Sequence, residues 1–230
     1  MIKILKKLEN LIVKIQSILI RFRISTRLNN SKVKSDPKEQ QLDVYWTESF
    51  KNELNFWGED TVWREIELLF AAVEGNVVDI CCGVGGTIKK LEKNEKLKLY
   101  GFDISDYLID EAINSGLSRD RLKVANATNT GYEDNYFDYS YSIGSLEHFT
   151  ENDIDSFLKE TKRITKKSSF HQIPVARDKK FDGWLELDQS YFNKPVDWWL
   201  ERFEKHFDHV SVIESSWNDP ISFGKWFICK

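Results

Sequence analysis

The segment VVDICCGVGG, residues 77–86, constrains the fold more than any other part of the sequence. A short apolar strand leads through Asp79 into a tight turn that contains Gly83, Gly85 and Gly86, and a helix follows. Glycine lets the backbone approach a ligand where a Cβ would collide. A strand, a glycine turn and a helix in succession are typical of an α/β unit that binds its ligand at the carboxyl end of the strand.

Strands and helices alternate along the rest of the chain. We expect strands at residues 76–81, 97–103, 121–126, 136–143 and 168–173, the last stopped by Pro174, and a terminal strand pair at 209–215 and 223–229. Helices are expected at 61–73, 86–94, 106–114, 151–165 and 196–207, with Asp60, Ser105 and Thr150 as N-caps and Pro195 at the start of the last one. This pattern predicts an α/β fold, a doubly wound and mostly parallel seven-stranded sheet with an antiparallel C-terminal strand pair.

The first 35 residues differ from the rest in charge. They carry nine Lys or Arg side chains and one Glu, a formal charge of +8, in a chain whose total is −4. At helical spacing, residues 1–24 show a basic face opposite an apolar one, which predicts an amphipathic helix in peripheral contact with an anionic membrane. A helix packed on the body or on a partner subunit, and disorder, are the alternatives. Residues 25–44 are polar and typical of a linker, so we divide the chain into residues 1–35 and a main domain, 36–230.

Composition excludes several classes of protein. Hydrophobic residues make up 41% of the chain, enough to bury a core, and no uncharged apolar run is long enough to span a membrane. The remainder after residue 35 is acidic, which argues against nucleic acid as a partner. Three cysteines, Cys81, Cys82 and Cys229, cannot form an even disulfide framework, so a cytoplasmic location is expected. No second ligand cluster accompanies Cys81 and Cys82, so we expect no metal.

A second acidic residue strengthens the glycine turn as a nucleotide site. Asp103 ends the strand 97–103 about twenty residues beyond the turn, where a carboxylate can accept both hydroxyls of a ribose. A NAD site would need Gly or Ala three residues beyond Gly85, and that position is Ile88. The dehydrogenase interpretation is therefore disfavoured.

With these motifs, the sequence from about Trp57 onward resembles the class I S-adenosylmethionine-dependent methyltransferases of the small-molecule type. Residues 79–85 resemble the acidic-x-Gly-x-Gly-x-Gly motif, with Cys81 in place of the first glycine, and the most specific match is FDYSYSIGSLEHF, residues 137–149. Residues 126–128 read Asn-Ala-Thr where the family usually has Asp-Ala. The resemblance implies a Rossmann-like methyltransferase fold, S-adenosylmethionine as cofactor and S-adenosylhomocysteine as product.

The resemblance also implies a set of cofactor-binding residues. Asn126 would accept a hydrogen bond from the adenine amino group through its amide oxygen, and residues 142–144 would lie under the methionine part. The full set is Asp79, Cys81, Gly83, Gly85, Asp103, Ile104, Asn126, Ala127, Thr128, Ser142, Ile143 and Gly144.

Methyl transfer from a sulfonium is an in-line displacement, which a general base assists when the acceptor is a hydroxyl or a protonated amine. Polar residues after the fourth and fifth strands are candidates for this role, and we select His148, Glu147 and His171. Each has a simpler interpretation: His148 packs near the cofactor, His171 is a satisfied core residue, and Glu147 caps or pairs.

Two aromatic stretches, residues 44–60 and an insertion at 177–199, are candidate substrate walls. They mix flat apolar surface with amides, which suits a sugar or another polar ring, although many of these aromatics must belong to the core. The residues selected are Tyr45, Trp46, Trp57, Arg177, Trp184, Gln189, Tyr191 and Asn193.

The sequence therefore predicts a methyltransferase for a small polar acceptor, such as a sugar or a lipid-linked glycan precursor at the cytoplasmic face of a membrane. Two alternatives stay open. One is a methyltransferase of a soluble metabolite that uses the N-terminal segment to oligomerise, and the other is a non-catalytic cofactor-binding module. The acceptor atom and the oligomeric state are left open.

Overall fold

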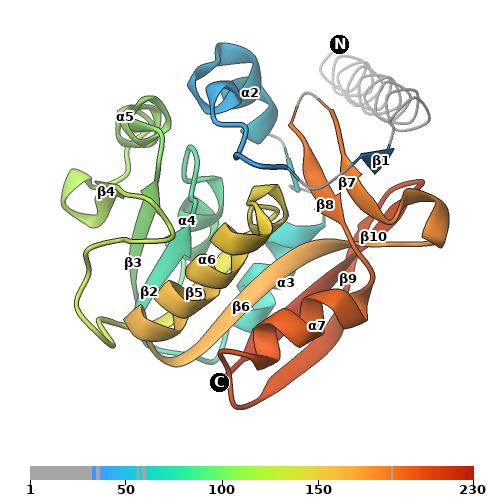
Figure 1. Ribbon diagram of the computed structural model, residues 1–230. Coiled ribbons are helices and arrows are strands. Elements are labelled where there is room, and N and C mark those ends of the chain that lie inside the picture. The colour runs from blue at the N-terminus through green and yellow to red at the C-terminus, as the bar shows by residue number, and fades with distance from the viewer. Residues whose placement is uncertain (1–32, 35–36, 56, 59–60, 188) are drawn as a thin grey trace, which may run out of the picture.

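The computed structural model describes residues 33–34, 37–55, 57–58, 61–187 and 189–230, and its centre is a seven-stranded sheet (Figure 1). The strand order is β4-β3-β2-β5-β6-β10-β9, in which β4 to β6 run parallel and β10 pairs antiparallel with both β6 and β9. The expected doubly wound sheet with an antiparallel terminal pair is confirmed. The predicted helix at residues 1–24 and the N-cap at Asp60 lie outside the described residues.

The elements have the following bounds. The sheet contains β2 (Gly75–Ile80), β3 (Leu97–Asp103), β4 (Leu122–Val124), β5 (Phe137–Ile143), β6 (Thr165–Ala176), β9 (Val210–Asn218) and β10 (Ser222–Cys229). The helices are α2 (Glu48–Leu54), α3 (Val62–Leu69), α4 (Gly86–Leu91), α5 (Asp106–Asn114), α6 (Glu151–Ile164) and α7 (Val196–Glu204). Short 3-10 turns are η1 (Asp43–Trp46), η2 (Arg119–Arg121), η3 (Leu146–His148) and η4 (Lys179–Phe181), and β1 (Val33–Lys34), β7 (Gly183–Leu185) and β8 (Tyr191–Asn193) form a second, small sheet.

Helices cover both faces of the large sheet because its strands carry apolar side chains on both sides. In β2, Val78 packs into a core that includes Phe157 of α6 and Phe203 of α7, whereas Val77 packs into a second core that includes Ile66 of α3 and Ile109 of α5. In Figure 1, α6 and α7 lie in front of the sheet and α3 behind it. This arrangement directs the carboxyl ends of the parallel strands to one edge.

Local capping signals place two of the helices as expected. The Ser105 hydroxyl accepts a hydrogen bond from the Leu108 N–H at 3.2 Å and begins α5, and the Thr150 hydroxyl accepts from the Asp153 N–H at 3.2 Å and begins α6. Each cap satisfies a backbone donor that the first helical turn leaves without a partner.

The prediction that Pro174 stops the fifth strand is wrong, because β6 continues to Ala176. Pairing of β6 with β5 ends at Gln172. At Pro174 the ladder partner is β10, opposite Gly224, and only an isolated bridge between Val175 and Lys194 follows on the other side of the strand. A proline is tolerated at such a position because it removes a donor from one side of the strand only.

The small sheet joins the start of the described chain to the insertion at residues 177–199. β1 pairs antiparallel with β7, with Val33 opposite Leu185, and β7 pairs with β8. Part of the stretch expected as a linker is therefore a strand. The ring of Trp184 in β7 packs against Phe192 of β8 with centroids 4.9 Å apart, and both side chains are buried.

A single carboxylate joins α3 to the antiparallel edge of the large sheet. Glu65 accepts hydrogen bonds from the Ser215 hydroxyl at 2.7 Å, from the Trp226 indole N–H at 2.7 Å and from the Ser216 N–H. Partial burial would raise the pKa of Glu65, but these donors hold it below its ordinary value. The charged form is therefore the one that stabilises the fold.

We predict that Glu65→Gln lowers the free energy of unfolding at pH 7 by about 1–3 kcal/mol, because a hydrogen bond to a charged group contributes this much and an amide brings a donor to a site of three donors. Because the pKa of Glu65 is lower in the folded than in the unfolded state, the carboxylate stabilises the fold at pH values above its unfolded-state pKa. This contribution is lost as the pH falls through the folded-state pKa. The difference in the free energy of unfolding between Glu65→Gln and wild type should therefore shrink on acidification. Urea titrations from pH 7 to pH 3 measure it. Glu67→Gln on the same helix, whose carboxylate lies 3.5 Å from Lys93 at the surface, should cost much less. An equal loss in both variants would contradict the prediction.

Candidate functional site

The glycine turn and the end of β3 are joined by a buried hydrogen bond. The Gly83 N–H donates to Oδ2 of Asp103 at 2.9 Å, and the Ser105 N–H donates to Oδ1 at 3.0 Å. Asp103 is 6% exposed, and burial raises its pKa although these backbone donors oppose the rise. The turn therefore brings a carboxylate to the carboxyl edge of the sheet and fixes its orientation.

A second carboxyl group lies on the other side of the turn. Oδ2 of Asp79 accepts a hydrogen bond from the Thr87 hydroxyl at 2.5 Å, and the Tyr141 hydroxyl donates to Thr87 at 3.3 Å. Burial raises the pKa of Asp79 to about 7, against the hydrogen bonds that lower it. Neither carboxyl group has a Lys or Arg among its described hydrogen-bond partners.

The turn itself adopts left-handed backbone at three positions. Cys81, Gly83 and Gly85 have φ values of 61°, 51° and 73°. Cys81, which occupies the first glycine position of the motif that the sequence resembles, thus places a side chain in a conformation that glycine adopts more readily. A Cβ on Gly83 would lie 2.8 Å from Cδ1 of Leu54, so glycine there allows α2 to approach the turn.

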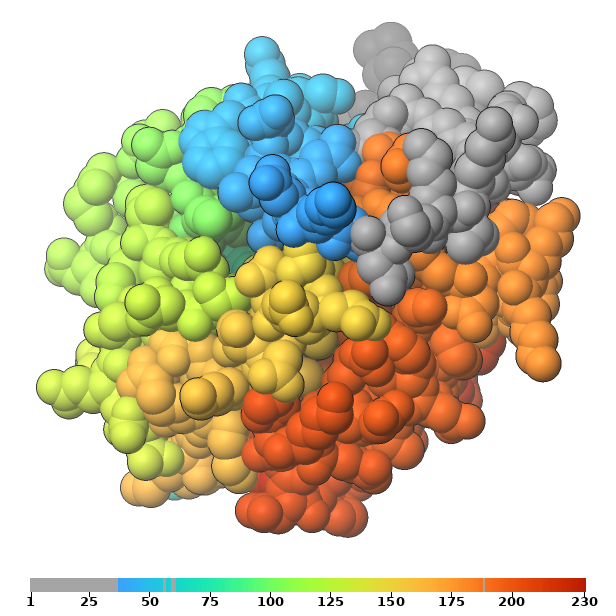
Figure 2. All heavy atoms as spheres, in the orientation of Figure 1, coloured from blue at the N-terminus to red at the C-terminus, as the bar shows by residue number. Residues whose placement is uncertain are grey.

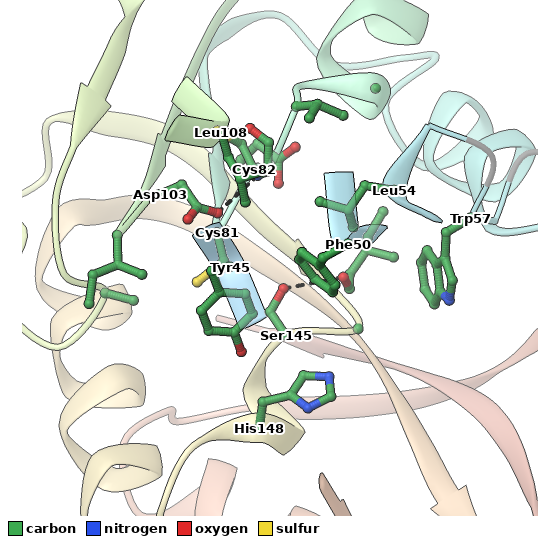
Figure 3. A pocket seen from close by; sticks show the side chains of 18 of the residues that line it. Tyr45, Phe50, Leu54, Trp57, Cys81, Cys82, Asp103, Leu108, Ser145 and His148 are labelled. Atoms are coloured by element: carbon green, nitrogen blue, oxygen red, sulfur yellow. Dashed lines mark hydrogen bonds between the residues drawn. The ribbon is translucent and has the colours of Figure 1, made fainter. Parts of the chain in front are cut away.

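These residues line a pocket that also receives the ends of β3, β4 and β5 (Figure 3). Its empty volume is about 890 Å³, part of it open to solvent. Of the residues expected to bind cofactor or substrate, or to act in catalysis, the lining includes Tyr45, Trp57, Asp79, Cys81, Gly83, Asp103, Ile104, Asn126, Ala127, Ile143, Gly144, His148 and Gln189.

The segment before α3 forms one wall of the pocket, and the insertion meets it there. Tyr45 and Phe50 lie edge to face at 5.3 Å, and Gln189 of the insertion donates to the Tyr45 hydroxyl at 3.4 Å. In Figure 2 the blue atoms of this segment lie against the yellow loop that follows β5. In the view of Figure 3, Asp103 and His148 lie on opposite sides of the Tyr45 ring.

His148 is a buried, oriented imidazole on the pocket wall. Its Nδ1 lies 2.8 Å from the Ser190 carbonyl oxygen, and because a carbonyl only accepts, Nδ1 carries the proton and Nε2 of the neutral ring has a free lone pair. Burial lowers the pKa of His148 to about 4, partly offset by the carbonyl groups of Ser190 and Gly144. Glu147 lies behind this wall rather than on it, and burial raises its pKa to about 8.

His171 and Ser142, both selected from sequence, lie in the core and not in the pocket. The Ser142 hydroxyl and Nδ1 of His171 are 2.8 Å apart, both side chains are fully buried, and the His171 ring packs against Phe203 at 5.3 Å. Their positions on β5 and β6 point them toward α6 and α7. His171 is therefore a core residue, although its Nε2 has no hydrogen-bond partner among the described residues. Burial lowers the pKa of His171 to about 3.

Two other residues of the cofactor set also lie outside the pocket lining. Gly85 supports the turn, since its left-handed backbone begins α4 and a Cβ would collide with Leu117. Thr128 donates through its N–H and its hydroxyl to Oδ1 of Asn126, both at 2.9 Å. These bonds occupy the amide oxygen that was expected to accept from adenine, and they leave the Asn126 amide N–H₂ as the group available to a ligand.

Five of the expected substrate residues lie away from the pocket. Trp46 is 44% exposed and its indole N–H donates to Asp106 at 2.8 Å, while Arg177 donates to the carbonyl of Asp219 at 2.9 Å in the β9–β10 loop. The remaining three are buried in the small sheet: Trp184, Tyr191 and Asn193.

Sequence reasoning missed several lining residues, because their roles depend on long-range packing. Phe50 and Leu54 of α2 lie in the stretch 44–60 that was expected as a wall, although neither was selected. Trp63 of α3 and Leu108 of α5 reach the pocket through packing that leaves no local signal, and neither does the amide of Gln40. The missed residues are Gln40, Phe50, Leu54, Trp63, Cys82, Val84, Gly86, Thr87, Leu108, Ser145 and Phe149.

The described ranges contain neither a metal-binding cluster nor a membrane-spanning helix. These residues bring together no group of three or more His, Cys, Asp or Glu side chains that could hold a metal ion. Within the same residues, no helix has the length and apolar character needed to cross a bilayer. Cys81, Cys82 and Cys229 are free thiols.

Comparison with known proteins matches residues 77–168 to a family model described as a methyltransferase domain. Among curated proteins, phosphoethanolamine N-methyltransferase of Triticum aestivum is 28% identical over 97 residues, which span 41% of this chain and only 19% of the wheat enzyme.

Solved structures resemble this chain over much more of its length. Phosphoethanolamine N-methyltransferase 2 of Haemonchus contortus, solved with phosphomonomethylethanolamine and S-adenosylhomocysteine, has a TM-score of 0.61 at 16% identity over 78% of this chain and 56% of that one. A SAM-dependent methyltransferase of Aquifex aeolicus has a TM-score of 0.58 at 17% identity over 83% and 100%. At these identities the likeness concerns the fold.

The left-handed backbone at Cys81 yields a stability prediction. Cys81→Gly should leave the free energy of unfolding unchanged or raise it by up to about 1 kcal/mol, because relief of the strained φ offsets the greater freedom of glycine in the unfolded chain. Cys81→Val should lower it by about 1–3 kcal/mol, because a β-branched side chain is poorly tolerated at positive φ. Urea denaturation measures both. Cys229→Val, at a buried cysteine in strand β10, controls for the change of side chain, and a Cys81→Val protein as stable as wild type would refute the strain argument.

Proposed function

We propose that this chain, which carries a class I S-adenosylmethionine-dependent methyltransferase domain, transfers a methyl group from S-adenosylmethionine to a small polar acceptor. The observation that carries the proposal is the pairing of the Gly83 N–H with the buried carboxylate of Asp103 at the edge of the pocket. The family match covers this turn and this carboxylate.

The described residues fit the cofactor in charge. Asp79 and Asp103 line the pocket with carboxyl groups, the described lining contains no Lys or Arg, and Tyr45 and Trp57 contribute aromatic faces. S-adenosylmethionine carries a sulfonium and an ammonium group, and both are favoured by carboxylates and aromatic rings. Burial without a countercharge explains the raised pKa of Asp79, and a bound cation would remove that cause.

The pocket residues also offer hydrogen-bonding groups that suit S-adenosylmethionine. A carboxylate offers about four acceptor positions, so Asp103 keeps capacity for ribose hydroxyls beside its backbone donors. Asn126 lines the same pocket, and its amide N–H₂ can donate to a ring nitrogen. When bound, S-adenosylmethionine supplies the electrophilic methyl group.

His148 is the general base that the pocket offers. Its neutral ring presents a lone pair on Nε2, and the Ser190 carbonyl fixes its orientation. A positioned base of this kind contributes about 10²–10⁴-fold to a rate, and holding acceptor and methyl group in line contributes more.

The acceptor end of the pocket suits a neutral polar ring, such as a sugar. Gln40 and Gln189 supply amides there, and Tyr45 and Trp57 supply flat apolar surface. A phosphate-bearing acceptor such as phosphoethanolamine finds no Lys or Arg in the described lining. Residues 1–24, with their basic and apolar faces, support an acceptor that is lipid-linked and a cytoplasmic, peripheral attachment to the membrane.

We predict that the protein binds S-adenosylmethionine at pH 8 in a calorimetric titration, and that Asp103→Ala weakens binding by about 100-fold or more through loss of two charge-assisted hydrogen bonds. Affinity should fall by up to about tenfold per pH unit below pH 7, because Asp79 must lose its proton to face a cation, and Asp79→Asn should flatten this dependence.

The same protein, incubated with methyl-labelled cofactor and cell extract, should yield a labelled product by mass spectrometry that Asp103→Ala does not form. Glu160→Gln serves as the matched control, since this carboxylate is buried against Arg163 and Thr130 in α6 and lies outside the pocket lining. No binding would refute the proposal, and binding without any labelled product would favour the non-catalytic module.

For the membrane, we predict that full-length protein sediments with vesicles that contain anionic lipid, and that deletion of residues 1–30 releases it, because each Lys or Arg near such a surface contributes about 1 kcal/mol. Neutral vesicles provide the control. Partition that the deletion leaves unchanged would refute the attachment. Light scattering of both proteins tests the alternative, in which the deletion converts an oligomer to a monomer.

A further inference from the structure

Glu147 is a buried carboxyl group whose hydrogen-bond donor among the described residues is its own backbone N–H. Its side chain belongs to a residue only 3% exposed, and Oε2 has no hydrogen-bond partner in the described part of the chain. A buried polar atom without a partner costs about 1–3 kcal/mol. No salt bridge to a Lys or Arg of the described residues offsets this cost, so its retention calls for a role outside folding.

The carboxyl group lies directly behind the wall of the pocket. Oε1 is 3.9 Å from Nε2 of His148, and a Cβ on Gly144 would lie 3.6 Å from the same oxygen. Both Gly144 and His148 line the pocket. The carboxyl group therefore lies next to two residues of the pocket wall without lining the pocket itself.

The other titratable groups near Glu147 are neutral at ordinary pH. The Cys81 thiol and the Tyr191 phenol interact with it electrostatically, and burial raises the pKa of each well above neutrality. Tyr191 also lies edge to face with the His148 ring at 6.1 Å. His148 is thus the group near Glu147 that can acquire a charge during a reaction.

The orientation of His148 makes that charge appear at Nε2. Because Nδ1 donates to the Ser190 carbonyl, a proton taken from an acceptor must go to Nε2, the atom 3.9 Å from Glu147. A buried imidazolium is unfavourable, as the lowered pKa of His148 indicates. A carboxylate at this distance would offset the cost, since opposite charges a few ångströms apart in a protein attract strongly.

We propose that Glu147 is a positioning residue that acts through His148, its carboxylate stabilising the imidazolium that forms when Nε2 takes the acceptor's proton. The inference rests on the proposed methyl transfer. In that step the acceptor's O–H or N–H bond breaks, its electron pair forms the new bond to the methyl carbon, and the carbon–sulfur bond breaks with its pair left on sulfur. Positive charge thus moves from the sulfonium to the His148 ring, where the carboxylate of Glu147, 3.9 Å from Nε2, would stabilise it.

The first test follows the imidazole nitrogens by NMR, so that no acceptor is needed. Full-length protein with ¹⁵N-labelled histidine is titrated from pH 5 to pH 10 in the presence of S-adenosylhomocysteine, and His148→Gln assigns the resonance among the four histidines. Nε2 of His148 should shift with a midpoint near pH 8 as Glu147 ionises, while Nδ1 stays protonated. Glu147→Gln should abolish this step, and Glu147→Asp should keep a step of altered midpoint.

The second test measures methylation of cell extract at saturating cofactor. The wild-type rate should rise between pH 7 and pH 9, and Glu147→Gln should lose this rise and fall at least tenfold below wild type at pH 9. Glu160→Gln is again the control and should retain the rise. Circular dichroism checks folding. If Glu147→Gln does not fold, Glu147→Asp carries the test, and its rate should rise with pH at a midpoint shifted from that of wild type.

A His148 signal without a step near pH 8, or a step that survives in Glu147→Gln, would overturn the inference. Calorimetry with S-adenosylhomocysteine keeps the two proposals apart. Binding with no step rejects the role of Glu147 alone, whereas absence of binding rejects the methyltransferase proposal itself.

Discussion

The hydrogen bond from the Gly83 N–H to the Asp103 carboxylate links two βα units at the point on which the site depends. It can form because β2 and β3 are parallel neighbours, so that the turn after one meets the last residue of the other. The turn needs left-handed backbone to present that N–H, and the strain at Cys81 is part of the same geometry. Once the bond is made, the position of a carboxylate is fixed at the edge of the pocket, and the closure of α2 over the turn depends on the missing Cβ of Gly83.

The electrostatics in and around the pocket are dominated by carboxyl groups that are buried without a Lys or Arg of the described residues beside them. Asp79, Asp103 and Glu147 are each less than one-tenth exposed, and burial raises the pKa of all three. In a protein without ligand this arrangement is unfavourable, and a cationic ligand is what would reverse it. The pKa of His148 is lowered instead of raised, because burial disfavours the charged form of the ring, which is the protonated one. The same desolvated region thus holds acids whose pKa values are raised beside an imidazole whose pKa is lowered. In the proposed reaction, a positive charge that formed on the imidazole would be stabilised by a neighbouring carboxylate.

Features set by local chemistry were predictable from sequence, and features set by long-range packing were not. Ser105 and Thr150 cap their helices because a hydroxyl at the N-cap position needs only the next turn. Asp103 was found from its spacing to the glycine turn. The sequence could not show which of His148 and His171 lies in the pocket. His171 lies on the face of β6 that points into the core, and the orientation of His148 depends on the Ser190 carbonyl, which comes from the insertion. The strand pairing of β1 with β7 likewise joins residues about 150 positions apart, for which the local pattern gives no signal.

The pocket is built partly from residues inside the family match and partly from residues outside it. Similarity to other methyltransferases therefore supports the proposed cofactor end more strongly than the proposed acceptor end. The family match at residues 77–168 contains Asp79, Asp103 and His148. Other parts of the wall come from segments on either side of that match. Tyr45 precedes it and Gln189 follows it, and the neighbouring Ser190 carbonyl holds His148 from behind the lining. These segments are tied to each other, since Gln189 donates to Tyr45 and the Ser190 N–H donates to Gln41 at 3.2 Å. The orientation of His148, the proposed base, is therefore set by the same insertion that lines the proposed acceptor end. A change in the insertion would then alter the proposed acceptor fit and the tautomer of His148 together, while the turn at Gly83 and Asp103 stayed as it is.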